Sequence, residues 1–576
     1  MNWPYQFVKL SQEQKHERRQ ILDQYALYAQ FSALFPIAFF VLLRFNRSLL
    51  KRIMGEVPTY NAVKTSPVIE TKNQSPDSSI LVKWRRWRWW LGDDVEIAGR
   101  CLGHRGQLLF GGLWAAWLLF LCINETGNDY YHVTKRFGII GTSQLPLQYL
   151  LSSKRLNPAA YAFYTSHETI NRWHRTLGWI IYFLVFLHGT FYLNFYIQVG
   201  GLGGAFFRTV PALGMLGLLS MTILSTTTLS VLRKYSYRIF YITHVTVGVA
   251  LPLIIWFHVS HSRVFMAEAF MVPLADLFIR RCYRITVNAT IDFVPGTDLV
   301  RIVANIPSHK LSQFAAHPAS HVFLSIPSRS RPGRNSFSLA NLRLGFLSNP
   351  FTVASINEEL GTITLVARQM KGPVTAALAR LASLQAPGSK VALNIDGPYG
   401  AAAHFPNMAG TSFDKILLVA GGVGATFIMP LFDSISTENA AAQLELVWAV
   451  RDASEVAWPV LATGGTVHDD ERIRLFVTSG KEEPEEIAVP SSEEYEDVEL
   501  NRLKKNNARF TNIPVENHKR PDLQRIVDNL CRQGAYDRIA VIVCGPVQMT
   551  RDSRKAVGTW VKRKRNIWFH SETFGW

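Results

Sequence analysis

Long apolar segments alternate with short polar ones over the first half of the chain. Because a bilayer core about 30 Å thick requires roughly 20 apolar residues per helix, this alternation predicts membrane-spanning helices. Seven spans are expected, of which the third and the seventh are short or interrupted by polar residues. They are residues 26–44, 108–124, 137–152, 173–195, 207–231, 238–257 and 263–279.

The pattern changes after Arg284, where short β-like runs alternate with turns rich in Gly and Pro. A strand–loop–helix pattern follows from residue 413 and indicates an α/β nucleotide-binding domain. Within it, an acidic run at about 480–507 is predicted to be a surface insertion. The strands expected after the membrane half are residues 283–291, 299–306, 321–326, 363–368 and 415–420.

Basic residues gather in the polar segments between the apolar runs and give the chain a net charge of +18. This distribution orients membrane proteins, and it argues against nucleic-acid binding. The segment 44–105 contains twelve Lys or Arg, interleaved with Trp at 83–90, which is typical of the cytosolic membrane interface. Counting spans from that segment places the N-terminal tail and the loops 125–136, 196–206 and 258–262 outside. A glycosylation sequon at Asn124 would report this topology.

The candidate metal ligands are histidines, because the five cysteines are scattered and predict neither a disulfide framework nor a zinc site. The fourth span contains His174 and His188, and the sixth contains His244 and His258. Each pair is separated by fourteen residues, which is close to four helical turns or about 21 Å, so both members face the same way. Two such helices side by side would bring His174 level with His244, and His188 level with His258.

Two levels of facing imidazoles predict bis-histidine axial ligation of two haem irons, one near each edge of the membrane. The alternative is that these histidines only form hydrogen bonds within a helical bundle. A matched double pair at identical spacing favours the haem interpretation. Two further assignments stay open: Arg172 and Arg175 either pair with haem propionates or anchor the inner side, and His261 either lines the outer exit or is solvated.

In the soluble half, Asn349-Pro350-Phe351-Thr352-Val353-Ala354-Ser355 carries a resemblance. The chain resembles the ferric reductase and NADPH oxidase superfamily of transmembrane flavocytochromes b, and within it the fungal-type ferric-chelate reductases. The family motif begins with His, so Asn349 departs from it. The resemblance implies that FAD lies along Pro350, Phe351, Thr352 and Ser355.

Further family motifs imply the rest of a ferredoxin–NADP reductase-like module, with a β-barrel FAD domain and an α/β nucleotide-binding domain. Gly372 and Thr375 precede a helical stretch and would hold the FAD pyrophosphate. A glycine-rich turn after a strand, with Gly421, Gly422, Gly424 and Thr426, would hold the phosphates of the nicotinamide nucleotide.

The nucleotide is predicted to be NADPH. A second strand ends in Arg451-Asp452, and an Arg at that place can bind a 2′-phosphate, whereas an acid favours the free ribose of NAD. Cys544-Gly545-Pro546 resembles the family segment beside the nicotinamide, so Cys544 would lie near the transferred hydride. At the C-terminus, Phe574 matches the family aromatic that covers the flavin ring, with Trp576 as the alternative.

Taken with the histidines, the resemblance implies electron transfer from NADPH through FAD and two b-type haems to a ferric or cupric chelate outside. A functional link to a metal permease or oxidase would follow, in the plasma membrane or an internal one. The alternatives are an oxidase that makes superoxide, and a transporter with a nucleotide-sensing domain. The expected divisions are 1–105 for the tail, first span and basic segment, 106–281 for haem, 282–405 for FAD and 406–576 for NADPH.

Overall fold

The computed structural model divides the chain into two compact units. The helical unit comprises Met1–Lys72 and Trp90–Cys282, and the reductase unit comprises Asn73–Trp89 and Tyr283–Trp576. The acidic insertion, Phe574 and Trp576 lie outside the described residues. Those described are 4–54, 79–97, 100–331, 344, 347–370, 372–384, 386, 388–408, 412–439, 442–459, 470–479, 515–517, 520–534 and 536–573.

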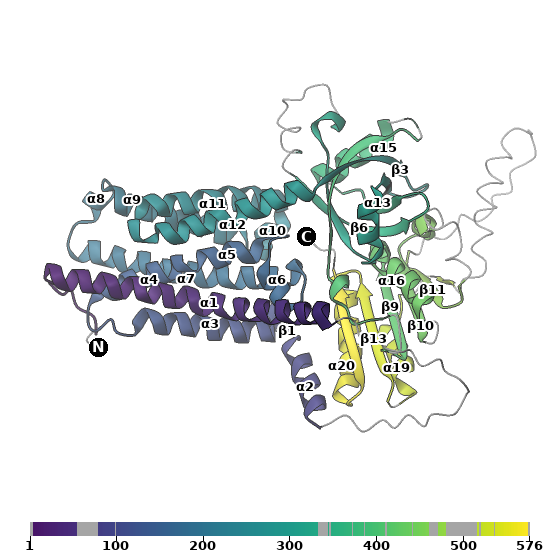
Figure 1. Cartoon of the computed structure of the whole chain (residues 1–576), viewed down its shortest axis with the longest axis horizontal. Coiled ribbons are helices and arrows are strands. Elements are labelled where there is room, and N and C mark those ends of the chain that lie inside the picture. Colours follow the sequence, from purple (N-terminus) through teal and green to yellow (C-terminus); the bar gives the residue numbers. More distant parts are fainter. Residues whose placement is uncertain are drawn as a thin grey trace, which may run out of the picture. The chain divides into compact units, whose positions relative to one another are not determined.

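The helical unit is a bundle of helices that run side by side (Figure 1). Within the described residues, five helices are long and apolar enough to cross a membrane, and large apolar side chains cover their outer surfaces. They therefore make this a multi-pass membrane protein. These five are α1 (Gln12–Met54), α3 (Arg105–Ile123), α7 (His167–Gln198), α9 (Thr209–Thr227) and α11 (Tyr237–His258).

The seven predicted spans are therefore not confirmed as seven. The third prediction is divided between α4 (Tyr130–Ser143) and α5 (Leu145–Ser152), which meet at Gln144, so neither piece is long enough to cross alone. The seventh is α12 (Arg263–Tyr283), whose apolar sequence is interrupted by two carboxylates. Both lie in the bundle with the other helices (Figure 1).

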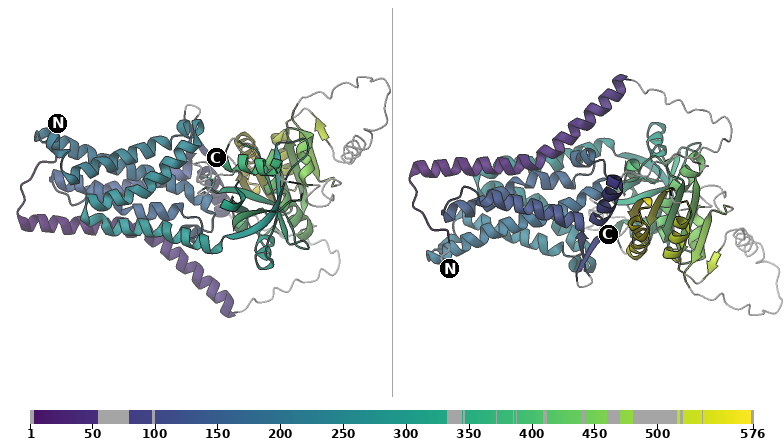
Figure 2. Two further views of the ribbon diagram at one scale, coloured as in Figure 1. Left: turned by 90° about the horizontal axis from the view of Figure 1, so that it is seen from above. Right: turned by 90° about the horizontal axis from the view of Figure 1, so that it is seen from below.

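The N-terminal segment lies beside the loop that follows α3. The backbone N–H of Gln6 donates to the carbonyl of Asn128 at 2.8 Å, and Arg18 forms an ion pair with Asp129 at 2.7 Å. The two segments are thus on the same side of the bundle, as the span count predicts. Helix α1 bends part-way along (Figure 2), which its internal Pro36 explains because proline cannot donate to the preceding turn.

Short elements connect the long helices. Helices α6 (Pro158–Phe163), α8 (Leu202–Ala205) and α10 (Ser230–Tyr235) and the 3-10 turn η1 (Ser260–Ser262) lie between spans. Before α3, helix α2 (Ser79–Leu91) is followed by a hairpin of β1 (Asp94–Ile97) and β2 (Arg100–His104).

The reductase unit begins with a closed antiparallel barrel of order β3-β4-β7-β6-β5-β8. Alternate residues along each strand fill its interior, which explains the alternating sequence pattern. Helix α13 (Ser308–Ala315) joins β4 to β5, and α15 (Pro373–Leu384) packs on the barrel core. The strands are β3 (Ile285–Phe293), β4 (Leu299–Asn305), β5 (His321–Ser325), β6 (Asn349–Asn357), β7 (Thr362–Arg368) and β8 (Val391–Tyr399).

A parallel sheet of order β12-β11-β10-β9-β13-β14 follows, flanked by α16 (Ala425–Glu438), α19 (Leu523–Arg532) and α20 (Val547–Lys562). Its strands are near-continuous apolar runs because both faces are covered. From β9 the next strands, β10 to β12, are added on one side, and β13 and β14 are added on the other. Ligands bind at such a switch point, beyond the carboxyl ends of the strands of a parallel sheet. The strands are β9 (Lys415–Gly421), β10 (Gln443–Val450), β11 (Ile473–Val477), β12 (Val515–Asn517), β13 (Arg538–Cys544) and β14 (Asn566–Glu572).

Candidate functional site: paired histidines and a nucleotide-binding module

Four histidines of the helical unit form two pairs between α7 and α11. The ring centroids of His174 and His244 lie 6.0 Å apart, and those of His188 and His258 lie 6.5 Å apart. The structure thus brings together the residues that the fourteen-residue spacing placed level with each other. Imidazole nitrogens bind metals at about 2 Å, and each ring centre lies roughly 1 Å behind its nitrogen, so two axial imidazoles on one iron require a centroid separation of about 6 Å. Both pairs fit that requirement.

Backbone carbonyls orient three of the four imidazoles. Nδ1 of His174 donates to the carbonyl of Gln148 at 2.9 Å, and Nδ1 of His188 to that of Thr134 at 2.8 Å. Nδ1 of His258 donates to the carbonyl of Val210 at 2.8 Å. A proton held at Nδ1 leaves Nε2 as the nitrogen with a lone pair, which is how metal-ligating histidines are positioned. Among the described residues, Nδ1 of His244 has no such acceptor.

Two glycines make room for the rings at one level. A β-carbon on Gly138 would lie 2.7 Å from Cε1 of His188, and one on Gly214 would lie 2.8 Å from Cε1 of His258. Gly138 belongs to α4 and Gly214 to α9, so neighbouring helices press on both imidazoles of this pair. This contact fixes the rings from the side, in addition to the Nδ1 hydrogen bonds.

In the reductase unit, the two glycine-containing motifs meet at the carboxyl ends of adjacent strands. β9 ends at Gly421 and β13 ends at Cys544, and the two strands pair in parallel. A β-carbon on Gly424 would lie 2.3 Å from the carbonyl oxygen of Cys544, and one on Gly421 would lie 2.6 Å from Cδ of Pro546. Only glycine permits the two turns to approach this closely. With no side chain in the way, the backbone N–H groups at the start of the helix at Ala425 can bind a phosphate.

The hydroxyl of Thr426 does not point out of this turn. It donates to the backbone carbonyl of Val423 at 2.9 Å, and the residue is buried. Gly422 has a positive φ of 54°, and its carbonyl accepts a hydrogen bond from the indole of Trp448 at 3.2 Å. These bonds shape the turn, so the phosphate contacts are left to backbone N–H groups.

Cys544 is fully buried and lies directly across from Glu572 of β14. Burial raises the pKa of its thiol well above the ordinary value, and the nearby Glu572 carboxylate raises it further. The side chain is therefore a neutral thiol at physiological pH, so it does not act as a nucleophile. Nε2 of His570 donates a hydrogen bond to the Glu572 carboxylate at 3.0 Å.

The predicted flavin motif forms β6 of the barrel. Thr352 pairs directly with His321 of β5, and His321 pairs on its other side with Tyr399 of β8. Cross-strand partners project to the same face, so the three side chains form one row. The rings of His321 and Tyr399 stack at 6.0 Å. Because Val322 of β5 lies in the barrel interior, this row lies on the outer surface.

The outer surface of β6 is covered by the nucleotide-binding domain. Ala354, two residues beyond Thr352, belongs to the same buried cluster as Ala420 and Cys544. The ion pair of Arg368 with Glu455 also joins barrel and nucleotide-binding domain, with 2.6 Å between Nη2 and Oε1. The row of Thr352, His321 and Tyr399 therefore lies on the barrel face that packs against the nucleotide-binding domain.

The other predicted flavin residues take different positions. Pro350 pairs with Phe323, whereas the ring of Phe351 packs against the barrel core. Ser355 lies beyond a register shift and pairs with Thr364 of β7. The hydroxyl of Thr375 donates to the carbonyls of Met370 and Gly372 at 3.0 and 3.2 Å. It therefore closes the loop ahead of α15 and leaves the backbone N–H groups of that helix start for an anion.

Arg451 and Asp452 have different surroundings at the end of β10. The carboxylate of Asp452 accepts from the backbone N–H and the hydroxyl of Ser454 at 3.0 and 2.9 Å. Arg451 is exposed. Asp452 is thus engaged by its own loop, and the side chain available for a nucleotide at this strand end is the cation.

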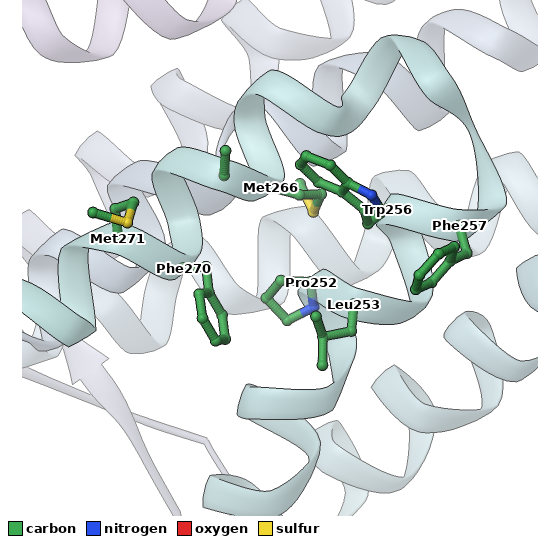
Figure 3. A pocket seen from close by; sticks show the side chains of 8 residues that line it. Pro252, Leu253, Trp256, Phe257, Met266, Phe270 and Met271 are labelled. Carbon is green, nitrogen blue, oxygen red and sulfur yellow. The ribbon is translucent and has the colours of Figure 1, made fainter.

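A separate apolar groove lies between α11 and α12 (Figure 3). Its lining includes Pro252, Leu253, Trp256, Met266, Phe270 and Met271, with the Phe270 ring directed towards Pro252 and Leu253. No charged side chain lines it. A nucleotide phosphate or a charged chelate would be unpaired there, so this groove is not the cofactor site.

A closed six-stranded barrel followed by a parallel nucleotide-binding sheet is a module of the ferredoxin-reductase type, a fold that binds FAD and a pyridine nucleotide, and here it accompanies a membrane-embedded helical unit. Residues 137–255 match the family model described as ferric reductase like transmembrane component, and residues 413–558 match the ferric reductase NAD binding domain. These matches confirm the resemblance to the ferric reductase family. The chain is an oxidoreductase that contains the transmembrane and NAD-binding domains of that family.

Fungal proteins are among its relatives. The probable metalloreductase AIM14 of Meyerozyma guilliermondii is 24% identical over 76% of this chain and 84% of its own length. Ferric reductase transmembrane component 1 of Schizosaccharomyces pombe is 22% identical over 78% of this chain and 81% of its own length. Ferric/cupric reductase transmembrane component 2 of the same yeast is 20% identical, over 76% and 80% respectively.

Sequence reasoning did not single out several residues of the site. His321 was placed in a strand without a role, and Tyr399 was not assigned, although it stands in a Gly-Pro-Tyr-Gly segment (397–400) at the end of the last barrel strand, β8. Arg368 and Glu455 are far apart in the chain and carry no motif. Only the barrel register and the packing of the two domains bring these four residues to the face where barrel and nucleotide-binding domain meet.

Proposed function

We propose that this protein carries electrons from cytosolic NADPH, with FAD and two b-type haems as cofactors, to a ferric or cupric chelate on the outer side of the membrane. The observation that supports it most is the two pairs of imidazoles, 6.0 and 6.5 Å apart, between two membrane-spanning helices. Imidazoles are costly at membrane depth unless they have a functional partner. His174 and His244 would hold the inner haem, and His188 and His258 the outer one.

FAD supplies the conversion between the two-electron donor NADPH and one-electron acceptors. Of the protein residues, Thr352 and Pro350 would line the flavin on β6, and the start of α15 at Gly372 and Thr375 would bind its pyrophosphate. Phe351, which packs in the barrel core, and Ser355 would support the part of β6 that lies along the ribityl chain of FAD. Phe574 is proposed as the ring that covers the flavin until the nicotinamide arrives.

For the nucleotide, Gly421, Gly422 and Gly424 would admit the phosphates to the turn after β9, with Thr426 holding the turn in shape. Cys544, Gly545 and Pro546 would lie beside the nicotinamide, where the buried thiol orients the ring without ionising. Arg451 would bind the 2′-phosphate. Its exposure and the engagement of Asp452 within its own loop are the reasons for proposing NADPH.

Assigning one cofactor site to each part divides the chain into four: the N-terminal region 1–105, the haem domain 106–281, the FAD domain 282–405 and the NADPH domain 406–576. We further propose the plasma membrane as the location, with a functional link to a metal permease or oxidase that takes up the reduced metal. The similar proteins include ferric and cupric reductases, which supports a metal chelate as acceptor.

Reduced-minus-oxidised spectra of the purified protein with NADPH would test the proposal, with ferric chelate and oxygen offered as competing acceptors. We expect bis-histidine haem bands that reoxidise with ferric chelate and a ferrous product that is unaffected by superoxide dismutase. Reoxidation that requires oxygen and yields superoxide would replace the metal assignment with that of an oxidase. No haem bands after haem-supplemented expression would overturn the role of the four histidines.

A further inference from the structure

One face of helix α2 is docked on the nucleotide-binding domain through Trp89. The guanidinium of Arg554 lies 4.3 Å over the Trp89 ring, and its Nη2 donates to the Trp89 carbonyl at 2.9 Å. The ring of Phe569 meets Trp89 edge-on at 5.7 Å, and a β-carbon on Gly558 would lie 3.1 Å from the indole nitrogen. This face of the helix is therefore already occupied.

The opposite face presents a stripe of large apolar side chains. Ile80, Trp84 and Trp87 follow the helical spacing i, i+4, i+7 and are 75%, 55% and 43% exposed. The rings of Trp84 and Trp87 lie 5.2 Å apart, so they form one continuous surface. An exposed apolar stripe of this kind, on a helix that also carries four basic residues, indicates a surface that lipid or another molecule covers.

The charged residues beside the stripe indicate which kind of molecule contacts it. α2 contains four basic residues and no acidic one, and Lys83, Arg86 and Arg88 are exposed beside the tryptophans. Trp is the residue most suited to the headgroup level of a bilayer, and Lys or Arg beside it binds anionic headgroups. The surface is therefore complementary to anionic lipid.

The C-terminal end of α2 is anchored at a membrane span. A β-carbon on Gly106 would lie 3.2 Å from the carbonyl oxygen of Leu91, and the guanidinium of Arg105 lies 5.1 Å over the ring of Trp90. Because α3 begins at Arg105 and is a membrane-spanning helix, the last turn of α2 meets the end of a span. Trp87 precedes the first residue of α3 by only 18 positions, so chain connectivity keeps the stripe close to the end of a membrane-spanning helix.

We propose that the Ile80–Trp84–Trp87 stripe of α2 lies in the cytosolic bilayer interface and binds anionic phospholipid headgroups through Lys83, Arg86 and Arg88. Each basic residue near an anionic surface strengthens attachment about fivefold, so the three together contribute on the order of 100-fold. This inference is independent of which acceptor the enzyme reduces.

The test uses the full chain in nanodiscs made of phosphatidylcholine alone or with added phosphatidylserine. Trp84→Cys is labelled with bimane in a chain whose exposed Cys101 and Cys282 are changed to Ser. Quenching by lipid-borne doxyl groups is compared with quenching by aqueous iodide. We expect strong doxyl quenching with phosphatidylserine, and its loss when Lys83, Arg86 and Arg88 are all changed to Gln.

A label at Val82, on the half-buried side of α2, is the matched control and should resist both quenchers. Iodide quenching of the Trp84 label in both lipid mixtures, without doxyl quenching, would overturn the proposal by showing a solvated surface. Protection from both quenchers would overturn it in favour of a covering protein. An unchanged elution profile in size-exclusion chromatography shows that each variant is folded.

Discussion

Gly138 lies so close to His188 that a β-carbon on the glycine would stand 2.7 Å from Cε1 and Nδ1 of the imidazole. The side chain of His188 sits in a space that a methyl group would fill. We therefore expect Gly138→Ala to displace this imidazole and to lower the haem content from two per chain to about one, as measured by pyridine haemochrome absorbance per protein.

The matched control is Gly248→Ala in α11, because a β-carbon there meets nothing within 4 Å. It should keep both haems. An unchanged haem content in Gly138→Ala would contradict the assignment of His188 as an axial ligand.

His321 offers a second prediction, at the flavin site. Its ring stacks on Tyr399 and stands directly beside Thr352. Since aromatic pairs contribute about 0.5–1.5 kcal/mol, His321→Ala should weaken FAD binding roughly 3- to 10-fold. A flavin fluorescence titration of the purified apoprotein measures this, and His309→Ala, at an exposed position, is the control. Equal FAD affinity in both variants would remove His321 from the site.

The third prediction concerns the choice of nucleotide. Arg451→Ala removes the cation at the end of β10, and hydrogen bonds to charged groups contribute about 1.5–3 kcal/mol. The KM for NADPH should therefore rise about 10- to 100-fold. NADH lacks the 2′-phosphate and is the internal control, so its KM should stay the same. A parallel rise for both nucleotides would mean that Arg451 does not read the 2′-phosphate.

The fourth prediction is a pH dependence of stability in the nucleotide-binding domain. Burial raises the pKa of Asp433 from 3.8 to about 6. The folded state therefore keeps a proton that the unfolded state releases between these values. The ionised side chain destabilises the fold above pH 6, and that cost vanishes as the pH falls through the window.

Asp433→Asn should accordingly stabilise the domain by roughly 1–2 kcal/mol at pH 7.5 and by nothing near pH 4. Thermal unfolding of the purified chain across this range measures the difference. Glu438→Gln on the same helix is the control, because its carboxylate is exposed and its removal relieves no buried charge. A constant gain at every pH would rule out titration of Asp433 as the cause.

The topology reporter suggested by the sequon is less suitable than the sequence alone indicates. The amide of Asn124 donates to the hydroxyl of Tyr25 at 2.6 Å, and the buried Thr126 hydroxyl donates to the carbonyl of Ile123 at 2.7 Å. Both sequon side chains are engaged at the end of α3. A glycan would have to displace these contacts, so we expect Asn124 to be unmodified, as an unshifted band after glycosidase treatment would show.

Local patterns predicted the long membrane helices and several of the strands. The barrel strands β3, β4, β5 and β7 and the first strand of the sheet, β9, begin within two residues of their predicted starts. Alternating and continuous apolar runs specify such strands because burial of one face or both faces leaves a direct imprint on the sequence. The span count was less well determined, since Gln144 interrupts the third span and carboxylates interrupt the seventh.

The sequence by itself determined the level pairing of the four histidines, because equal spacing on two helices is a property of the helical repeat. It also determined the two glycine-containing turns, whose residue types follow from the backbone approach they allow. Only the tertiary structure decided that Gly424 meets Cys544, that His321 stands beside Thr352, and that Arg368 reaches Glu455. These contacts join segments distant in the chain, and sheet order, barrel register and domain packing, which have no local sequence signal, bring them together.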